Sequence, residues 1–168
     1  MQQKKLQQKI RTMILFFIVM LVLSGVTAFP VYTELKWMKA QGWIDTNSLI
    51  GQWLERVWNG LNETNSHNAF LFYGYDWLAF AHIVIAMAFI GPLKDAVKNK
   101  WIIDWAMLAC ISVIPLALIC GTIRHIPWFH IAIDCSFGIL GLIPLSITSK
   151  WINQLEEMKS SAKHPDLQ

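Results

Sequence analysis

The residues of this chain that could carry chemistry gather in one short stretch, Thr122–Asp134, which reads TIRHIPWFHIAID. Between two long apolar segments it holds four ionisable residues: Arg124, His125, His130 and Asp134. Ionisable side chains at membrane depth are costly, so they usually face a bundle interior or a cavity and often mark function. His82, in another apolar segment, adds a further imidazole. These residue types suit ligand binding, metal coordination or haem ligation.

The composition points to a bilayer. Of the 168 residues, 55% are hydrophobic and only 15% are charged, and the mean hydropathy is +0.41. Soluble domains carry about 25% charged residues. The nine tryptophans also indicate a membrane protein, because tryptophan concentrates at membrane–water interfaces. The alternative of a soluble helical bundle is disfavoured, because helices in soluble proteins average about 11–12 residues and three of the four apolar runs are longer.

We therefore predict an all-α integral membrane protein with four transmembrane helices, at about 12–30, 77–93, 101–123 and 129–149. The first run, with basic residues before it and Val26–Ala28 after its core, also resembles a signal peptide. Its length favours a retained helix. The whole chain, 1–168, is expected to form one membrane domain, with a polar tail over 150–168 that frays into solvent.

Residues 31–75 are amphipathic and are expected to form short interfacial helices. Six apolar residues recur at three- and four-residue steps, which places them on one helical face: Ile50, Trp53, Leu54, Val57, Trp58 and Leu61. This helix would start at a cap on Asn47 or Ser48 and end at Asn59–Gly60. A shorter helix around 33–41 would stop at Gly42.

Charge placement predicts the orientation. Ten of the fourteen lysines and arginines lie before the first span, in 94–100 or after residue 149. By the positive-inside rule these three segments are cytoplasmic, and 31–75 with the Arg124–Phe129 turn is external.

The three cysteines all lie in apolar segments without a Cys-x-x-Cys pair, so a redox site is disfavoured, as is a Cys120–Cys135 disulfide. This pattern suits a bacterial inner membrane.

With this topology the polar residues converge near the outer leaflet. His82 lies roughly 7 Å into the second span at 1.5 Å per residue. His130 opens the fourth span, and Asp134 follows one turn later on the same face. Gly138 and Gly141 continue that face and are small enough to let another helix approach closely.

One interpretation of this cluster is purely structural. Asp76, Asp104 and Asp134 would lie in or before the first turns of their helices, where the macrodipole favours carboxylates. Arg124 would reach water at the interface or pair with Asp134 and tie two helices together. The protein would then be a non-catalytic accessory subunit of a membrane protein partner.

Three functional interpretations stand beside it. The favoured one is a pocket for a small apolar or lipid-like ligand or a cofactor. Its polar wall would come from the ionisable residues and its aromatic wall from tryptophans: His82, Arg124, His125, His130, Asp134, Trp77 and Trp128. The second is a single b-type haem between His82 and His130 or His125. The third is a zinc hydrolase with His82, His130 and Asp134 as ligands. Whether the protein is an enzyme is left open.

Nucleic acid is not an expected partner. The basic runs are not interleaved with aromatic residues as single-stranded nucleic-acid sites require. The chain also has no glycine-rich phosphate loop or nucleotide fingerprint. The expected partners are the lipid bilayer, a small ligand and another membrane protein.

Overall fold

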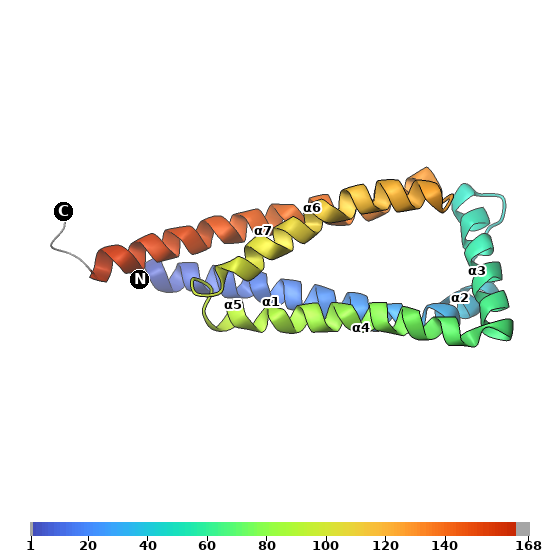
Figure 1. The fold of residues 1–168 in the computed structure, drawn as a ribbon, viewed down its shortest axis with the longest axis horizontal. Helices are drawn as coiled ribbons and strands as arrows, with labels where there is room; N and C mark the ends of the chain where they lie inside the picture. Colours follow the sequence, from blue (N-terminus) through green and yellow to red (C-terminus); the bar gives the residue numbers. More distant parts are fainter. Residues whose placement is uncertain (1, 164–168) are drawn as a thin grey trace. The chain divides into compact units, whose positions relative to one another are not determined.

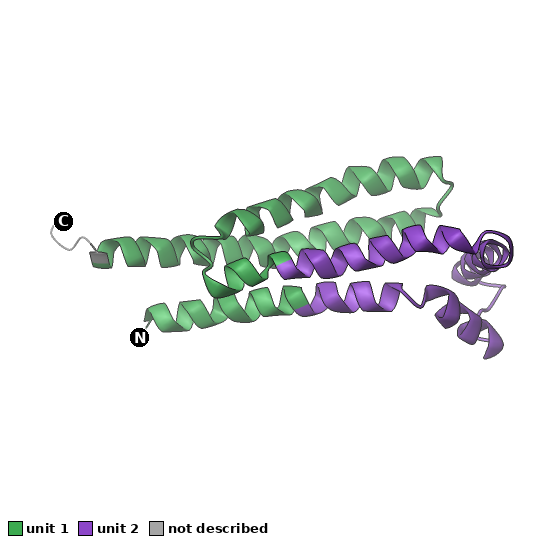
Figure 2. Cartoon of the chain, turned by 60° about the horizontal axis from the view of Figure 1, so that its bottom comes forward, with its two compact units in different colours: residues 1–18, 88–168 green, residues 19–87 purple. Residues whose placement is uncertain are grey.

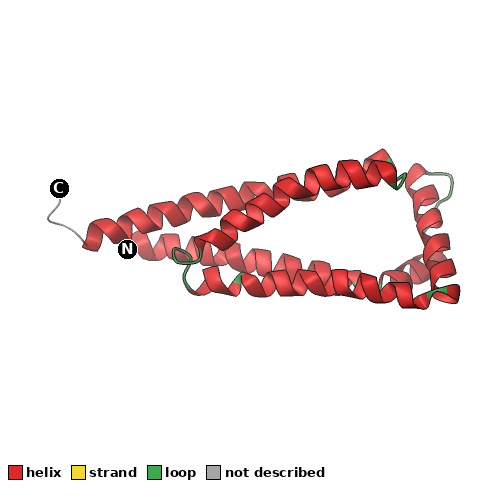
Figure 3. Ribbon diagram, viewed as in Figure 1, coloured by secondary structure: helices red, strands yellow, loops and turns green. Residues whose placement is uncertain are grey.

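The chain is built from helices (Figures 1 and 3). A computed structural model describes residues 2–163, so the last residues of the predicted tail, 164–168, lie outside the described residues. The helices are α1 Gln2–Ala28, α2 Val31–Ala40, α3 Leu49–His67, the 3-10 helix η1 Ala69–Leu71, α4 Phe72–Ala88, α5 Ile90–Lys94, α6 Lys100–Ile123 and α7 Trp128–Lys163. Every regular element in residues 2–163 is helical, which confirms the all-α prediction.

Four segments are long and apolar enough to cross a membrane: Gln2–Ala28, Ala69–Lys94, Lys100–Ile123 and Trp128–Ala162. Their number and order match the sequence prediction, but their ends do not. α1 starts well before residue 12, because the Lys, Gln and Leu residues that precede its apolar run are good helix formers. The second segment is interrupted at Phe89, since Pro92 has no N–H to donate to the Ala88 carbonyl.

The chain divides into two compact units (Figure 2). Unit 1 contains residues 1–18 and 88–168, and unit 2 contains residues 19–87. The expectation that residues 1–168 form a single membrane domain stays a prediction.

Unit 1 has a tightly packed core near the chain's N-terminus, which we call the basal core. It contains the largest fully buried side chains of the described residues: Ile10, Ile14, Phe89, Pro92, Ile103, Leu145, Thr148 and Ile152. Phe89 stacks on Phe17, with 5.8 Å between ring centroids. The Thr148 hydroxyl is satisfied there, because it donates to the Pro144 carbonyl at 2.7 Å. Residues from α1, α5, α6 and α7 thus meet in one core.

The prediction that the tail frays from Lys150 onward is wrong for the described residues. α7 continues to Lys163, and Ile152 and Leu155 are 0% and 2% exposed. Most polar residues of this stretch are Glu, Lys and Gln, which sustain a helix, and its apolar residues recur at helical spacing. The end of α7 is therefore part of the basal core.

α6 and α7 form an antiparallel pair in which glycines allow close approach. A Cβ atom added to Gly138 would lie 2.5 Å from the backbone oxygen of Cys110, and one added to Gly121 would lie 2.7 Å from Ile131. Small residues at helix contacts are the usual solution within membranes. The expectation that Gly138 and Gly141 admit a neighbouring helix is confirmed, and that helix is α6.

In unit 2, α2 and α3 pack through polar and aromatic contacts. Tyr32 stacks on Trp58 with 5.5 Å between ring centroids, and Lys39 pairs with Glu55. Ser48 caps α3 by accepting a hydrogen bond from the Gly51 amide at 3.0 Å, as predicted.

The predicted stop at Asn59–Gly60 is wrong, because α3 runs through it to His67. The predicted shorter helix does end before Gly42. Gly42 adopts a φ of 69°, a conformation that favours glycine.

Candidate functional site

The turn after α6 is a helix-ending motif built around His125. The Ile126 amide donates to the Gly121 carbonyl at 2.9 Å, and the His125 amide donates to the Thr122 carbonyl at 3.2 Å. These two bonds define a Schellman motif, whose residue at the position of His125 is usually glycine. His125 has a φ of 55°, so it bears a strain of about 1–3 kcal/mol that glycine would not. The backbone of this turn is therefore fixed by local hydrogen bonds, with Arg124 exposed beside it.

His130 and Asp134 lie on one face of α7. The helix begins at Trp128, and the His130 amide donates to the Pro127 carbonyl at 3.0 Å. Asp134 follows one turn after His130, which makes the two neighbours on the helix surface. Both side chains are half-buried. The same-face arrangement predicted from the sequence is thus what α7 provides.

Asp134 lies in an apolar setting. It stands between the two close contacts of the helix pair, Gly121 with Ile131 and Gly138 with Cys110. The antiparallel register places residues 114–118 of α6 level with it, and their sequence, IPLAL, has no ionisable group. Among the described residues of unit 1, the Asp134 carboxylate makes no hydrogen bond or ion pair. The Asp134 oxygens are not fully buried in the structure, but an unpaired carboxylate inside a membrane would be costly.

Two expectations of the structural interpretation are wrong. None of these three acids lies in the first turn of its helix: Asp76 and Asp104 are the fifth residues of α4 and α6, and Asp134 is the seventh residue of α7. The macrodipole acts mainly within the first turn, so it does not account for Asp134. Arg124 and Asp134 both belong to unit 1, and the predicted ion pair between them does not form among its described residues, where Lys100 pairs with Asp104.

The His82 ring is oriented on α4, in unit 2, by a contact within its own helix. Its Nδ1 lies 2.9 Å from the Leu78 carbonyl oxygen. A carbonyl can only accept, so Nδ1 is the donor of this hydrogen bond. A hydrogen bond of this kind is the one that orients an imidazole for coordination through Nε2. Trp77, one turn before Phe80 and edge-on to it at 6.3 Å, is exposed.

The predicted site residues are thus distributed over two units. Unit 1 holds Arg124, His125, Trp128, His130 and Asp134, and unit 2 holds Trp77 and His82. In residues 2–163 no three His, Cys, Asp or Glu side chains gather as metal ligands usually do. The three-residue metal set joins the two units, so it stays a prediction.

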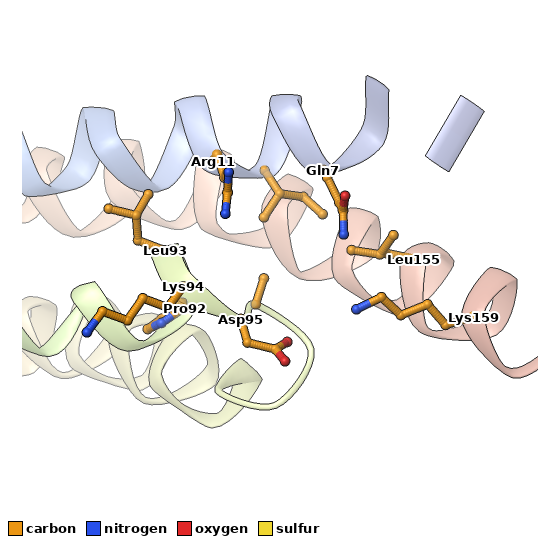
Figure 4. Close-up of a pocket in the computed structure, with 10 residues that line it drawn as sticks. Gln7, Arg11, Pro92, Leu93, Lys94, Asp95, Leu155 and Lys159 are labelled. Atoms are coloured by element: carbon orange, nitrogen blue, oxygen red, sulfur yellow. The ribbon is translucent and has the colours of Figure 1, made fainter. Parts of the chain in front are cut away.

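A polar hollow at the basal end was not anticipated from the sequence (Figure 4). It has a volume of about 120 Å³, and Arg11, Lys94 and Lys159 line it together with one acid, Asp95. Asp95 is engaged in the local turn, since its Oδ1 accepts from the Lys98 amide at 3.2 Å. Ligand pockets usually measure about 300–1,000 Å³, so this hollow is too small for an organic ligand.

A larger groove, also missed, runs between α1 and α7 in unit 1; we call it the α1–α7 groove. Its polar part has a volume of about 500 Å³ and its apolar part about 770 Å³. Lys5, Lys9 and Trp151 line both parts. The sequence carries a signal for this groove, a stripe of residues on one face of α1, but charge placement alone identifies its basic residues only as a topology signal.

Comparison with known protein families, with characterised proteins and with solved structures gives no match to this chain.

Proposed function

We propose that this chain is an integral membrane protein that crosses a bacterial inner membrane four times, with both termini in the cytoplasm. Support comes from side chains that a soluble protein would bury. On α6 and α7, Leu116, Phe137 and Leu140 are each more than 60% exposed. Large exposed apolar patches on soluble proteins are rare, whereas lipid tails would cover these side chains.

The topology predicts opposite labelling of two engineered cysteines. In a background with Cys110, Cys120 and Cys135 replaced by alanine, Asn59→Cys should react with a membrane-impermeant maleimide on intact cells, because 31–75 is external. Ser160→Cys should react only after the cells are permeabilised. Labelling of Ser160→Cys in intact cells, or recovery of the protein outside the membrane fraction, would contradict the proposal.

We further propose that the protein binds a small or lipid-like ligand or cofactor through the polar residues near the α6–α7 turn. The observation that supports this function is the half-buried Asp134 carboxylate, which has no partner among the described residues of unit 1. A ligand with a cationic or hydrogen-bond-donating group would supply the partner, and His130 lies one turn away to assist. The competing function is that of an accessory subunit whose partner protein supplies it.

The ligand is tested by mass spectrometry of species that co-purify with the full-length protein. We expect at least one species to be lost, by tenfold or more, from Asp134→Asn and His130→Ala. Ser136→Ala is the matched control, because this half-buried side chain only donates to the Ile133 carbonyl of its own helix. Identical profiles of co-purifying species in the parent protein and its three variants would refute the ligand site. A membrane protein that co-purifies instead would favour the accessory role.

The same preparations separate the cofactor alternatives. A b-type haem bound by His82 would give a Soret band that disappears in His82→Ala. A zinc site would retain stoichiometric zinc that His130→Ala loses. Colourless protein without bound iron or zinc removes both alternatives and leaves the organic ligand.

A further inference from the structure

We propose that the α1–α7 groove binds an anionic phospholipid, with its headgroup at Lys5 and Lys9 and an acyl chain along the apolar part. The proposal rests on membrane insertion as proposed above, but not on a ligand at Asp134. The two sites share no residue.

One face of α1 changes character along the groove. The residues that line its apolar part occur at steps of three and four: Lys5, Gln8, Lys9, Thr12, Met13 and Phe16. They form a single stripe roughly 16 Å long at 1.5 Å per residue. The stripe begins with Lys5, Gln8 and Lys9, continues through Thr12 and ends with the apolar Met13 and Phe16. A phospholipid has the same order of groups, from phosphate through ester to hydrocarbon.

A contact with Trp151 fixes the depth of the cationic end of the groove in the membrane. The Lys9 ammonium lies 5.7 Å from the centroid of the Trp151 ring, within the range of a cation–π contact. Tryptophan favours the headgroup level of a bilayer, so this contact places the Lys9 charge where a lipid phosphate lies. Lys5 is one turn nearer the N-terminus on the same face. Glu157 lines the polar part together with Lys5 and Lys9, so two cations face one carboxylate there and the headgroup end keeps a net positive charge.

The other end suits hydrocarbon. Met13, Phe16 and Pro144 line it, and Phe16 is 51% exposed. The whole apolar part, including its lysines, has a volume of about 770 Å³, which falls within the usual range for ligand pockets, about 300–1,000 Å³. Basic pockets beside transmembrane helices on the cytoplasmic side are common sites for anionic headgroups. Charge and shape together favour a lipid of the inner leaflet over a soluble anion or a second copy of the chain.

The proposal is tested by titrating phosphatidylglycerol into delipidated full-length protein in detergent and measuring retained lipid by native mass spectrometry. We expect Lys5→Gln with Lys9→Gln to weaken binding by about fivefold for each lysine. The matched control is Lys4→Gln with Lys98→Gln, which removes the same charge from exposed lysines that line neither part of the groove. Equal losses in both double variants would mean attraction by net charge alone and would overturn the site.

Two alanine variants test the apolar end of the groove. Phe16→Ala should weaken phosphatidylglycerol binding, whereas Leu15→Ala should not, because both side chains are 51% exposed and only Phe16 lines the groove. Phosphatidylcholine should bind more weakly than phosphatidylglycerol, and inorganic phosphate should not compete. Competition by phosphate would indicate a soluble anion, and a change of oligomeric state in Phe16→Ala without lipid loss would indicate a second copy. Either result would overturn the proposal.

Discussion

Replacing Gly138 with alanine is expected to destabilise the protein by roughly 1–3 kcal/mol, the usual cost of overpacking. The added methyl group would lie 2.5 Å from the backbone oxygen of Cys110 and 3.4 Å from Ile114 Cγ1. A backbone oxygen within a helix cannot rotate away, so α6 and α7 would have to separate. The loss would exceed the gain in helix propensity, about 1 kcal/mol, that alanine gives over glycine. Thermal unfolding in detergent, followed by circular dichroism, measures the effect.

Gly141→Ala provides the matched control one turn along the same helix. Its methyl group would lie 2.9 Å from the Cys110 Sγ, which is the end of a side chain and can change rotamer. We expect this variant to melt within a few degrees of the parent protein. Gly60→Ala, whose new methyl group meets nothing within 4 Å, should be neutral or stabilising. If Gly138→Ala were as stable as Gly141→Ala, the close approach of α6 and α7 would be contradicted.

Much of the fold could be predicted from hydropathy alone. The four apolar runs are long enough that only helices satisfy their backbone groups, and the small residues at 138 and 141 indicate a helix contact. The ends of the helices could not be found in this way. Lys, Gln and Glu dominate the segments that flank the apolar runs of α1 and α7, and they mark the end of hydrophobicity but not the end of a helix.

The candidate site was predictable only where it depends on one helix. The shared face of His130 and Asp134 follows from the period of α7, and it is confirmed. The partner of Asp134 depends on the register of α6 against α7, and the sequence pattern does not show which residue of α6 lies level with Asp134. The expected pair with Arg124 is therefore wrong. The α1–α7 groove was detectable as a stripe on α1, but Trp151 completes it from more than a hundred residues away in the sequence.

Leu155→Ala is expected to destabilise the protein by about 2–5 kcal/mol, the usual cost of truncating a buried leucine. Leu155 is 2% exposed, and it lies beyond the predicted end of the fourth span. Water surrounds this part of α7 in the proposed topology, so the hydrophobic effect stabilises the basal core there as it would in a soluble protein. Glu156→Ala is the control, because the neighbouring side chain is exposed. Equal melting temperatures for the two variants would mean that the end of α7 frays after all, and the basal core would then have to end near Thr148.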